Sequence, residues 1–210
     1  MNVLIAGSHG QVGQHATRIL AGSDHGVQGM IRAEAQAPDI EDLGAEAVVA
    51  DLTEDVSNAL EGIDAVIFAA GSGGEDVWGV DRDGAMNLID GAEAEGVERF
   101  VMLSSIGADH PANGPEELRE YLRAKAEADE YLRESDLTYT IVRPGPLTDE
   151  GGTGRIKTGA DLDGDVEIPR EDVSRTLVAA LGAESTFGET FELAAGDLPI
   201  EAALQEPLDD

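Results

Sequence analysis

The chain has 210 residues, of which 41% are hydrophobic, so it is long enough to form one α/β domain with a sizeable core. It has no cysteine, which excludes disulfides and thiolate metal sites and favours a cytoplasmic location. Residues 1–7 lack the basic start of a signal peptide, and no apolar run reaches the roughly 18 residues needed to cross a bilayer.

Acidic residues dominate the charge. Asp and Glu number 44 against 13 Lys and Arg, which gives a formal net charge of -31 spread along the whole chain. Regular apolar segments distinguish this chain from a disordered acidic one. Concentrated salt screens such repulsion, with a Debye length of about 3 Å at 1 M, so we predict a halophilic protein rather than an ordinary acidic one. The same charge disfavours binding to nucleic acid or to an anionic membrane.

Apolar runs alternate with helical patterns from the first residues onward. Strands are predicted at residues 3–6, 26–31, 47–50, 63–69, 100–104, 138–142 and 190–194. Helices are predicted at residues 11–21, 55–60, 81–95, 115–134 and 170–181. This alternation is typical of βαβ units, and it predicts the α/β fold class: one doubly wound Rossmann domain with a mostly parallel sheet and its ligand at the carboxyl ends of the strands.

The chain shows no internal repeat and no linker, so we expect a single domain over residues 1–210. Residues 1–143 would form the Rossmann core, residues 144–200 the substrate-side loops with a late helix and strand, and residues 201–210 a frayed tail. Glycines and prolines between residues 144 and 154 mark a long loop. The loops at 71–79, 106–115 and 144–165 are expected to shape the substrate pocket, but they carry no pattern that identifies the substrate.

A glycine-rich loop, GSHGQVG at residues 7–13, follows the first predicted strand and opens the first helix. Small residues there allow a tight turn, close approach of the backbone to a pyrophosphate and close packing of the helix. The amino end of the helix adds free N–H groups and a positive dipole. The loop therefore predicts a dinucleotide site, the alternative being a tight turn that binds nothing.

The end of the second strand bears on the choice of cofactor. An NAD enzyme tends to place Asp or Glu there, whereas this chain has Arg32, which can pair with a 2′-phosphate. We therefore predict NADP rather than NAD, unless Arg32 is only a solvated loop charge. His9 is a second possible donor to that phosphate. Asp51 is expected to accept a hydrogen bond from the adenine amino group, the alternative being a helix N-cap or a loop acid.

Three residues carry the predicted chemistry. Ser105 follows the fifth strand, and Tyr121 and Lys125 lie four residues apart on the next helix, where they share a face. A free tyrosine has a pKa of about 10. We expect the lysine ammonium to lower the pKa of Tyr121 toward neutrality, so that its hydroxyl exchanges a proton with a substrate oxygen held by Ser105. The alternative is an ordinary pair on an exposed helix.

In this order, these motifs resemble an atypical short-chain dehydrogenase/reductase of the NmrA-like and sugar-epimerase-like branch. The resemblance also includes TIVRPGPL at residues 140–147 and IPREDVS at residues 168–174, and it covers nearly the whole chain. It implies that Ser105, Tyr121 and Lys125 are catalytic, that Lys125 also touches the nicotinamide ribose, and that Pro144 and Gly145 lie beside the nicotinamide. The carboxy-terminal part is short for an enzyme that holds a nucleotide sugar, which favours a small carbonyl or alcohol substrate.

The sequence thus predicts an NADP-dependent oxidoreductase without a metal site, as a monomer or homodimer. The alternatives are a non-catalytic NADP-binding redox sensor or regulator and an NAD(P)-dependent epimerase. The residues predicted to bind the cofactor are Gly7, Ser8, His9, Gly10, Gln11, Val12, Gly13, Arg32, Asp51, Leu52, Ala69, Ala70, Gly71, Ser104, Tyr121, Lys125, Pro144 and Gly145.

Overall fold

The computed structural model describes residues 1–164 and 166–205. Strands that pair in parallel form most of one sheet. They are β1 (Asn2–Ala6), β2 (Gly26–Ile31), β3 (Glu46–Val49), β4 (Ala65–Phe68), β5 (Arg99–Leu103), β6 (Thr138–Pro144) and β10 (Glu189–Ala195). Antiparallel pairing extends this sheet beyond β10 through β8 (Arg155–Gly159) and β11 (Leu198–Pro199). A separate pair is formed by β7 (Leu147–Thr148) and β9 (Ile168–Pro169).

Among the described residues the large sheet has nine strands, in the order β11-β8-β10-β6-β5-β4-β1-β2-β3. Strand β1 lies between β2 and β4, so the chain winds outward in both directions from this point. In open parallel sheets of this kind, ligands bind beyond the carboxyl ends of the strands at that switch point. The predicted α/β fold, a doubly wound Rossmann sheet that is mostly parallel, is confirmed.

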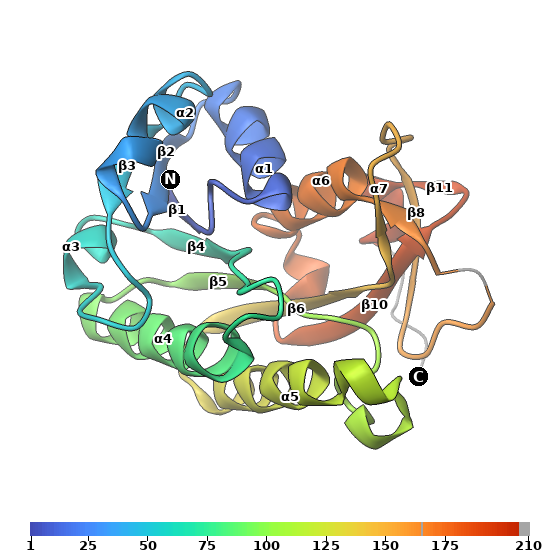
Figure 1. The fold of residues 1–210 in the computed structure, drawn as a ribbon. Coiled ribbons are helices and arrows are strands. Elements are labelled where there is room, and N and C mark those ends of the chain that lie inside the picture. The colour runs from blue at the N-terminus through green and yellow to red at the C-terminus, as the bar shows by residue number, and fades with distance from the viewer. Residues whose placement is uncertain (165, 206–210) are drawn as a thin grey trace.

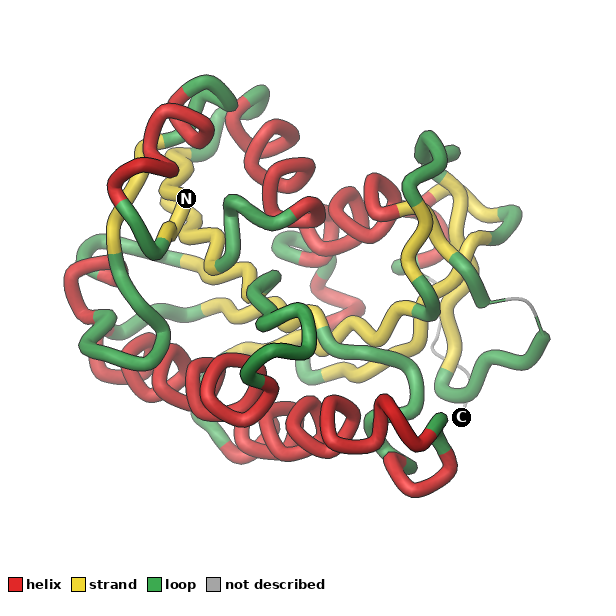
Figure 2. Tube along the Cα trace, in the orientation of Figure 1, coloured by secondary structure: helices red, strands yellow, loops and turns green. Residues whose placement is uncertain are grey.

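Helices cover both faces of the sheet. They are α1 (Gln11–Ala21), α2 (Ala37–Glu41), α3 (Ser57–Leu60), α4 (Gly84–Glu95), α5 (Arg119–Glu134), α6 (Arg170–Ala180) and α7 (Ile200–Ala203). Figure 1 shows α1, α2 and α6 on one side of the strands and α3, α4 and α5 on the other. The tube drawing in Figure 2 shows the same two groups of helices with the strands between them.

The alternation of side chains along β1 divides the core into two parts. Leu4 and Ala6 belong to the apolar cluster that contains the buried side chains of α3, α4 and α5. Val3 and Ile5 belong to the cluster that contains the buried side chains of α1, α6 and α7. Because successive residues of a strand face opposite sides, a continuous apolar strand fits a sheet that is buried on both faces.

Several boundaries differ from the predicted ones. The predicted helix 81–95 begins as a π-helix, Val77–Asp83, and becomes α-helical only at Gly84. The predicted helix 115–134 begins as a 3₁₀ turn, Glu116–Leu118, before α5. The predicted loop after residue 143 contains the antiparallel strand β8, and the short helix α2 was not predicted at all. These short elements are stabilised by pairing and packing within the fold rather than by their own periodicity.

The end of the chain also differs from the predicted frayed tail. At the end of α7 and directly after it, Ala203 and Leu204 are buried. The remaining residues of the predicted tail, 206–210, lie outside the described part of the chain. Position 165, the end of the predicted pocket loop 144–165, also lies outside it. No helix in the described part of the chain has the length and apolar character needed to span a membrane.

Candidate functional site

Two neighbouring cavities lie beyond the carboxyl ends of β1, β4 and β5. The first, which we call the site cavity, has a volume of about 580 Å³, and the second, the corner cavity, about 240 Å³. Both are lined by Ala69, Ala70 and Gly71, which directly follow β4. The two cavities therefore adjoin each other at the switch point of the sheet, where ligands bind in folds of this kind.

The backbone of the glycine loop is packed too tightly for side chains at two of its glycines. Gly7 has a φ of 85°, and a Cβ atom there would lie 2.6 Å from the Cα of Ala70. A Cβ atom on Gly13 would lie 2.1 Å from the carbonyl oxygen of Gly7, so α1 can approach the loop only without one. At Gly10, the N-cap of α1, no side chain caps the helix. The first N–H groups of α1 are thus available to a phosphate.

The corner cavity brings together the residues predicted to select the cofactor. His9, Arg32 and Leu52 line it, with Gly7 and Gly10. Among the described residues, no acidic group lies within 4.0 Å of the exposed Arg32 guanidinium, whereas the Nε2 atom of His9 lies 2.9 Å from Asp39 Oδ2. The role of Arg32 at a 2′-phosphate stays a prediction, and its guanidinium lies at the corner that the prediction requires.

Asp51 is not among the described residues that line either cavity. Its Oδ1 atom accepts hydrogen bonds from the backbone N–H of Thr53 at 2.9 Å and from the Thr53 hydroxyl at 2.8 Å. These bonds hold the pKa of Asp51 below its usual value. The carboxylate thus stabilises a local turn, which agrees with the alternative that Asp51 is a loop acid, and its contact with adenine stays a prediction.

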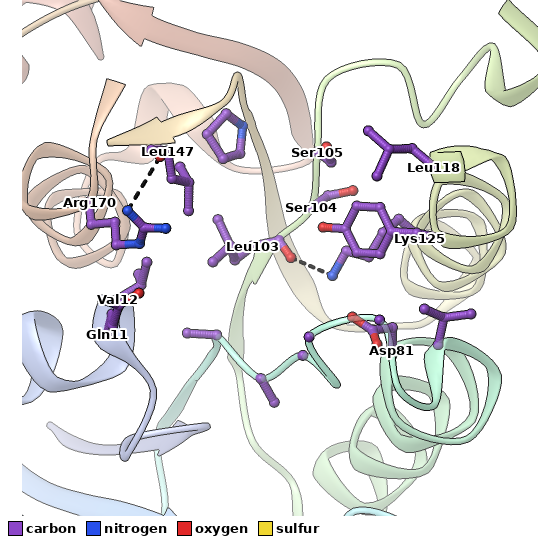
Figure 3. Close-up of a pocket in the computed structure, with 18 of the residues that line it drawn as sticks. Gln11, Val12, Asp81, Leu103, Ser104, Ser105, Leu118, Lys125, Leu147 and Arg170 are labelled. Atoms are coloured by element: carbon purple, nitrogen blue, oxygen red, sulfur yellow. Dashed lines mark hydrogen bonds between the residues drawn. The ribbon is translucent and has the colours of Figure 1, made fainter. Parts of the chain in front are cut away.

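Ser105, Tyr121 and Lys125 all line the site cavity. Figure 3 shows Ser104, Ser105 and Lys125 on one side of this cavity and Arg170, Gln11 and Val12 on the opposite side. The Lys125 Nζ atom donates a hydrogen bond of 2.6 Å to the carbonyl oxygen of Leu103, at the end of β5. This side chain is only 2% exposed, so the ammonium is fixed at the strand end.

The pKa of Tyr121 differs from the prediction. Burial, together with the nearby carboxylates of Asp81 and Asp129, raises the pKa of Tyr121 to about 12, while a hydrogen bond with Ser105 acts in the opposite direction. The predicted lowering toward neutrality is wrong, because the ammonium of Lys125 is directed at a backbone carbonyl and carboxylates surround the phenol. Burial lowers the pKa of Lys125 itself. Tyr121 is therefore a protonated phenol at neutral pH.

A buried ionic network lies behind these residues and was not predicted. Asp129 is fully buried, and its Oδ2 atom accepts hydrogen bonds from the Ser104 hydroxyl at 2.8 Å and from Arg143 Nε at 3.0 Å. Arg143 also pairs with Asp109 at 3.3 Å. The predicted cofactor residue Ser104 lines the site cavity but directs its hydroxyl to Asp129. Burial raises the pKa of Asp129, which Arg143 and Lys125 oppose.

Sequence reasoning missed four further charged residues that line the site cavity, Asp81, Glu117, Glu120 and Arg170. Asp81, in the π-helix, is 2% exposed, and its Oδ2 atom accepts hydrogen bonds from Ser72 N at 3.0 Å and from the Ser72 hydroxyl at 2.7 Å. π-Helical turns often occur at functional sites. Arg170, at the start of α6, donates to the carbonyl of Leu147 and pairs with Asp149 at 2.7 Å. Its position in the segment 168–174 was the available signal.

Most of the predicted residues come together at the two cavities. Those that line them are Gly7, His9, Gly10, Gln11, Val12, Arg32, Leu52, Ala69, Ala70, Gly71, Ser104, Ser105, Tyr121, Lys125, Pro144 and Gly145. Ser8 and Gly13, like Asp51, are not among the described lining residues. Ser8 is buried and donates a hydrogen bond to the carbonyl of Met30 at 2.9 Å, which fixes the loop to β2. Across residues 1–164 and 166–205, no three His, Cys, Asp or Glu side chains are grouped so that they could hold a metal ion.

Several known proteins are similar to this chain in fold and in sequence. A protein-family model described as NAD(P)H-binding matches residues 7–184. An uncharacterized sugar epimerase of Bacillus subtilis is 41% identical over 214 residues, which cover 98% of this chain and all of that protein.

Two solved structures are also similar over nearly their whole length. A candidate NAD-dependent epimerase/dehydratase of Bacillus halodurans has a TM-score of 0.94 and 40% identity, covering 98% of this chain and 99% of that one. An oxidoreductase of Lactococcus lactis has a TM-score of 0.89 and 32% identity, covering 98% and 95%. The expected resemblance is thus confirmed: this chain belongs to the NAD(P)H-binding Rossmann family of the NmrA-like and epimerase-like type.

Proposed function

We propose that this protein is an NADP-dependent oxidoreductase that acts on a carbonyl or alcohol substrate. The observation that carries the proposal is that Ser105, Tyr121 and Lys125 line the same cavity as Gln11 and Val12 of the glycine loop. A group that exchanges protons would then face a nucleotide held by that loop. When bound, the nicotinamide would supply a hydride to the substrate carbon or accept one from it.

Each of the three residues has a role that its surroundings support. The hydroxyl of Tyr121 keeps its proton at neutral pH, so it suits the role of acid in carbonyl reduction. Ser105 lies beside it and would hold the same substrate oxygen by a hydrogen bond. The ammonium of Lys125 is fixed by the carbonyl of Leu103 and would add positive potential where the oxygen accepts charge, and it would also contact the ribose.

The preference for NADP follows from Arg32 at the corner cavity. Fluorescence titration with NADPH and NADH in concentrated KCl tests it. We expect tighter binding of NADPH, and a loss of about 10- to 100-fold for NADPH alone in Arg32→Ala, because a charge-assisted contact contributes about 1.5–3 kcal/mol. Arg123→Ala, an exposed arginine of α5 away from both cavities, is the matched control. Equal affinity for both cofactors would refute the assignment of Arg32.

Turnover distinguishes the oxidoreductase from a non-catalytic redox sensor. Loss of a positioned acid costs about 10²- to 10⁴-fold in rate, so Tyr121→Phe should abolish most reduction of an aldehyde while leaving NADPH affinity nearly unchanged. Tyr131→Phe is the control, since its hydroxyl donates to Asp90 on α4 rather than facing the site cavity. NADPH binding without turnover of any carbonyl compound would favour the sensor.

The epimerase is the second candidate because similar proteins carry that name. An epimerase recycles its cofactor and must hold it through the whole reaction. Cofactor that remains bound through purification and shows no net consumption during turnover would favour the epimerase. Cofactor that exchanges freely and is consumed in proportion to substrate would favour the oxidoreductase.

A further inference from the structure

A third cavity, of about 860 Å³, adjoins the site cavity. The two share the lining residues Ser105, Leu118, Pro144, Gly145 and Leu147. Figure 3 shows three of these shared residues, Ser105, Leu118 and Leu147, around the site cavity. A substrate whose oxygen is held at Ser105 would therefore extend the rest of its atoms into this third cavity, which we call the acceptor cavity.

The walls of the acceptor cavity are mainly apolar and come from separate segments of the chain. Ligand pockets for drug-sized molecules have volumes of about 300–1,000 Å³, so this one is larger than a small carbonyl compound needs. Leu118 is 45% exposed, which is the kind of apolar surface that a ligand would cover. The apolar side chains of the lining are those of Ile106, Pro115, Leu118, Leu122, Pro144, Pro146, Leu147, Leu162 and Val166.

Acidic side chains outnumber basic ones in this cavity. Asp109, Asp161 and Glu192 line it, none of its described lining residues is Lys or Arg, and His110 is the one histidine among them. Glu192 is only 5% exposed, so its carboxyl belongs to the interior and not to the acidic surface. The guanidinium of Arg143 lies nearby, but Asp129 and Asp109 already pair with it. An anionic ligand would give up hydration here and find no unpaired Lys or Arg, with the exposed His110 as its one basic neighbour among the described lining residues.

We propose that the acceptor cavity binds the body of the substrate, and that this substrate is a large, mainly apolar carbonyl compound without a negative charge. The proposal rests on the proposed function for the position of the carbonyl oxygen at Ser105. The size and the apolar walls of the cavity favour a large apolar body, and its carboxyl groups disfavour anions. The same charges disfavour a nucleotide sugar, whose diphosphate would have to lie against them.

Equilibrium dialysis with a matched pair of ligands tests the charge selectivity. The neutral probe is 2-naphthaldehyde, and the anionic probe is 6-formyl-2-naphthoate, which differs by one carboxylate. Binding of both is measured in concentrated KCl with saturating NADP⁺, which cannot reduce an aldehyde, and turnover is followed in a separate assay by NADPH consumption. Salt screens a buried pair much less than a surface pair, so we expect the anion to bind at least about tenfold more weakly.

Variants of residues in the acceptor cavity test whether the difference in affinity between the two probes arises there. Glu192→Gln should bring the affinities of the two probes closer together, whereas Glu189→Gln, which changes an exposed residue of the same strand, should not. Leu162→Trp should fill the acceptor cavity and weaken binding of 2-naphthaldehyde. It should leave NADPH affinity unchanged, because Leu162 is not among the described residues that line the site or corner cavity.

The outcomes separate this proposal from the proposed function. Equal affinity for the two probes, or no binding of 2-naphthaldehyde, overturns the substrate class even if small aldehydes are reduced. Selective binding of 2-naphthaldehyde that Leu162→Trp removes supports the acceptor cavity, even if no NADPH is consumed. In that last case the oxidoreductase function fails and the pocket assignment stands.

Discussion

Replacement of Asp129 by Ala tests whether the buried ionic network holds the site together. The carboxylate is fully buried and accepts hydrogen bonds from Ser104 at 2.8 Å and from Arg143 at 3.0 Å. Its removal leaves Arg143 with the more exposed Asp109 at 3.3 Å, and leaves the ammonium of Lys125 without its nearest buried counter-charge on α5. Breaking a buried pair in this way costs about 3–5 kcal/mol.

Thermal unfolding in concentrated KCl, followed by circular dichroism, measures this cost. For a domain of this size, 1 kcal/mol corresponds to roughly 2–4 °C in Tm, so Asp129→Ala should lower the Tm by about 6–20 °C. Glu130→Ala is the matched control on the same helix. Its side chain is 64% exposed and pairs with Arg133 on the surface, which predicts about 0–1 kcal/mol.

The double variant Asp129→Leu with Arg143→Met separates loss of the pair from loss of the network as a whole. Replacing both members of a buried ion pair by apolar residues is often neutral or stabilising. We therefore expect the double variant to be more stable than Asp129→Ala. If Asp129→Ala unfolds at the same temperature as Glu130→Ala, the network contributes nothing and the reasoning is refuted.

Three further predictions follow from the loop, the phenol and the charge. Gly13→Ala should lower both the Tm and NADPH affinity, because its Cβ atom would lie 2.1 Å from the Gly7 oxygen, and a calorimetric scan with a cofactor titration checks it. The raised pKa of Tyr121, about 12 in the fold against about 10 when unfolded, adds stability that is complete below pH 10 and is lost as the pH rises toward 12. Alkaline titration of tyrosinate absorbance should lose a component of pKa about 12 in Tyr121→Phe. The net charge of -31 predicts a Tm that rises steeply with KCl, whereas a Tm independent of salt would contradict halophilic adaptation.

The fold could be predicted because the pattern of apolar residues along a strand depends on which of its faces are buried. Runs such as Val3 to Ile5 are apolar at every position, as a parallel strand covered on both faces requires. Strand β8, with the sequence RIKTG, carries no such run, and its antiparallel pairing with β10 and β11 makes it a strand. Its existence therefore depends on the tertiary structure, which local sequence does not encode.

The site could be predicted where the spacing of residues along one helix determines which cavity their side chains face. The positions of Tyr121 and Lys125 four residues apart on α5 predicted that both face the same cavity. The direction of the ammonium was not predictable, since the carbonyl of Leu103 that accepts its hydrogen bond belongs to another element. Asp129 continues the same face of α5, but in a chain with 44 acidic residues it looks like one more solvated carboxylate. Only its burial distinguishes it.

The distribution of charge gives salt two separate roles in this protein. The acidic surface repels itself and also repels an anionic cofactor, and both repulsions act over distances that salt screens. The pairs that Asp129 makes inside the fold, and any contact of Arg32 with a phosphate, act at hydrogen-bond distance, where screening is weaker. Salt should therefore remove the long-range opposition to folding and to cofactor approach while it leaves the short-range contacts largely intact. For this reason, low cofactor affinity in dilute buffer would say little about the site, because a chain of charge -31 opposes the approach of NADPH before any of its residues make contact.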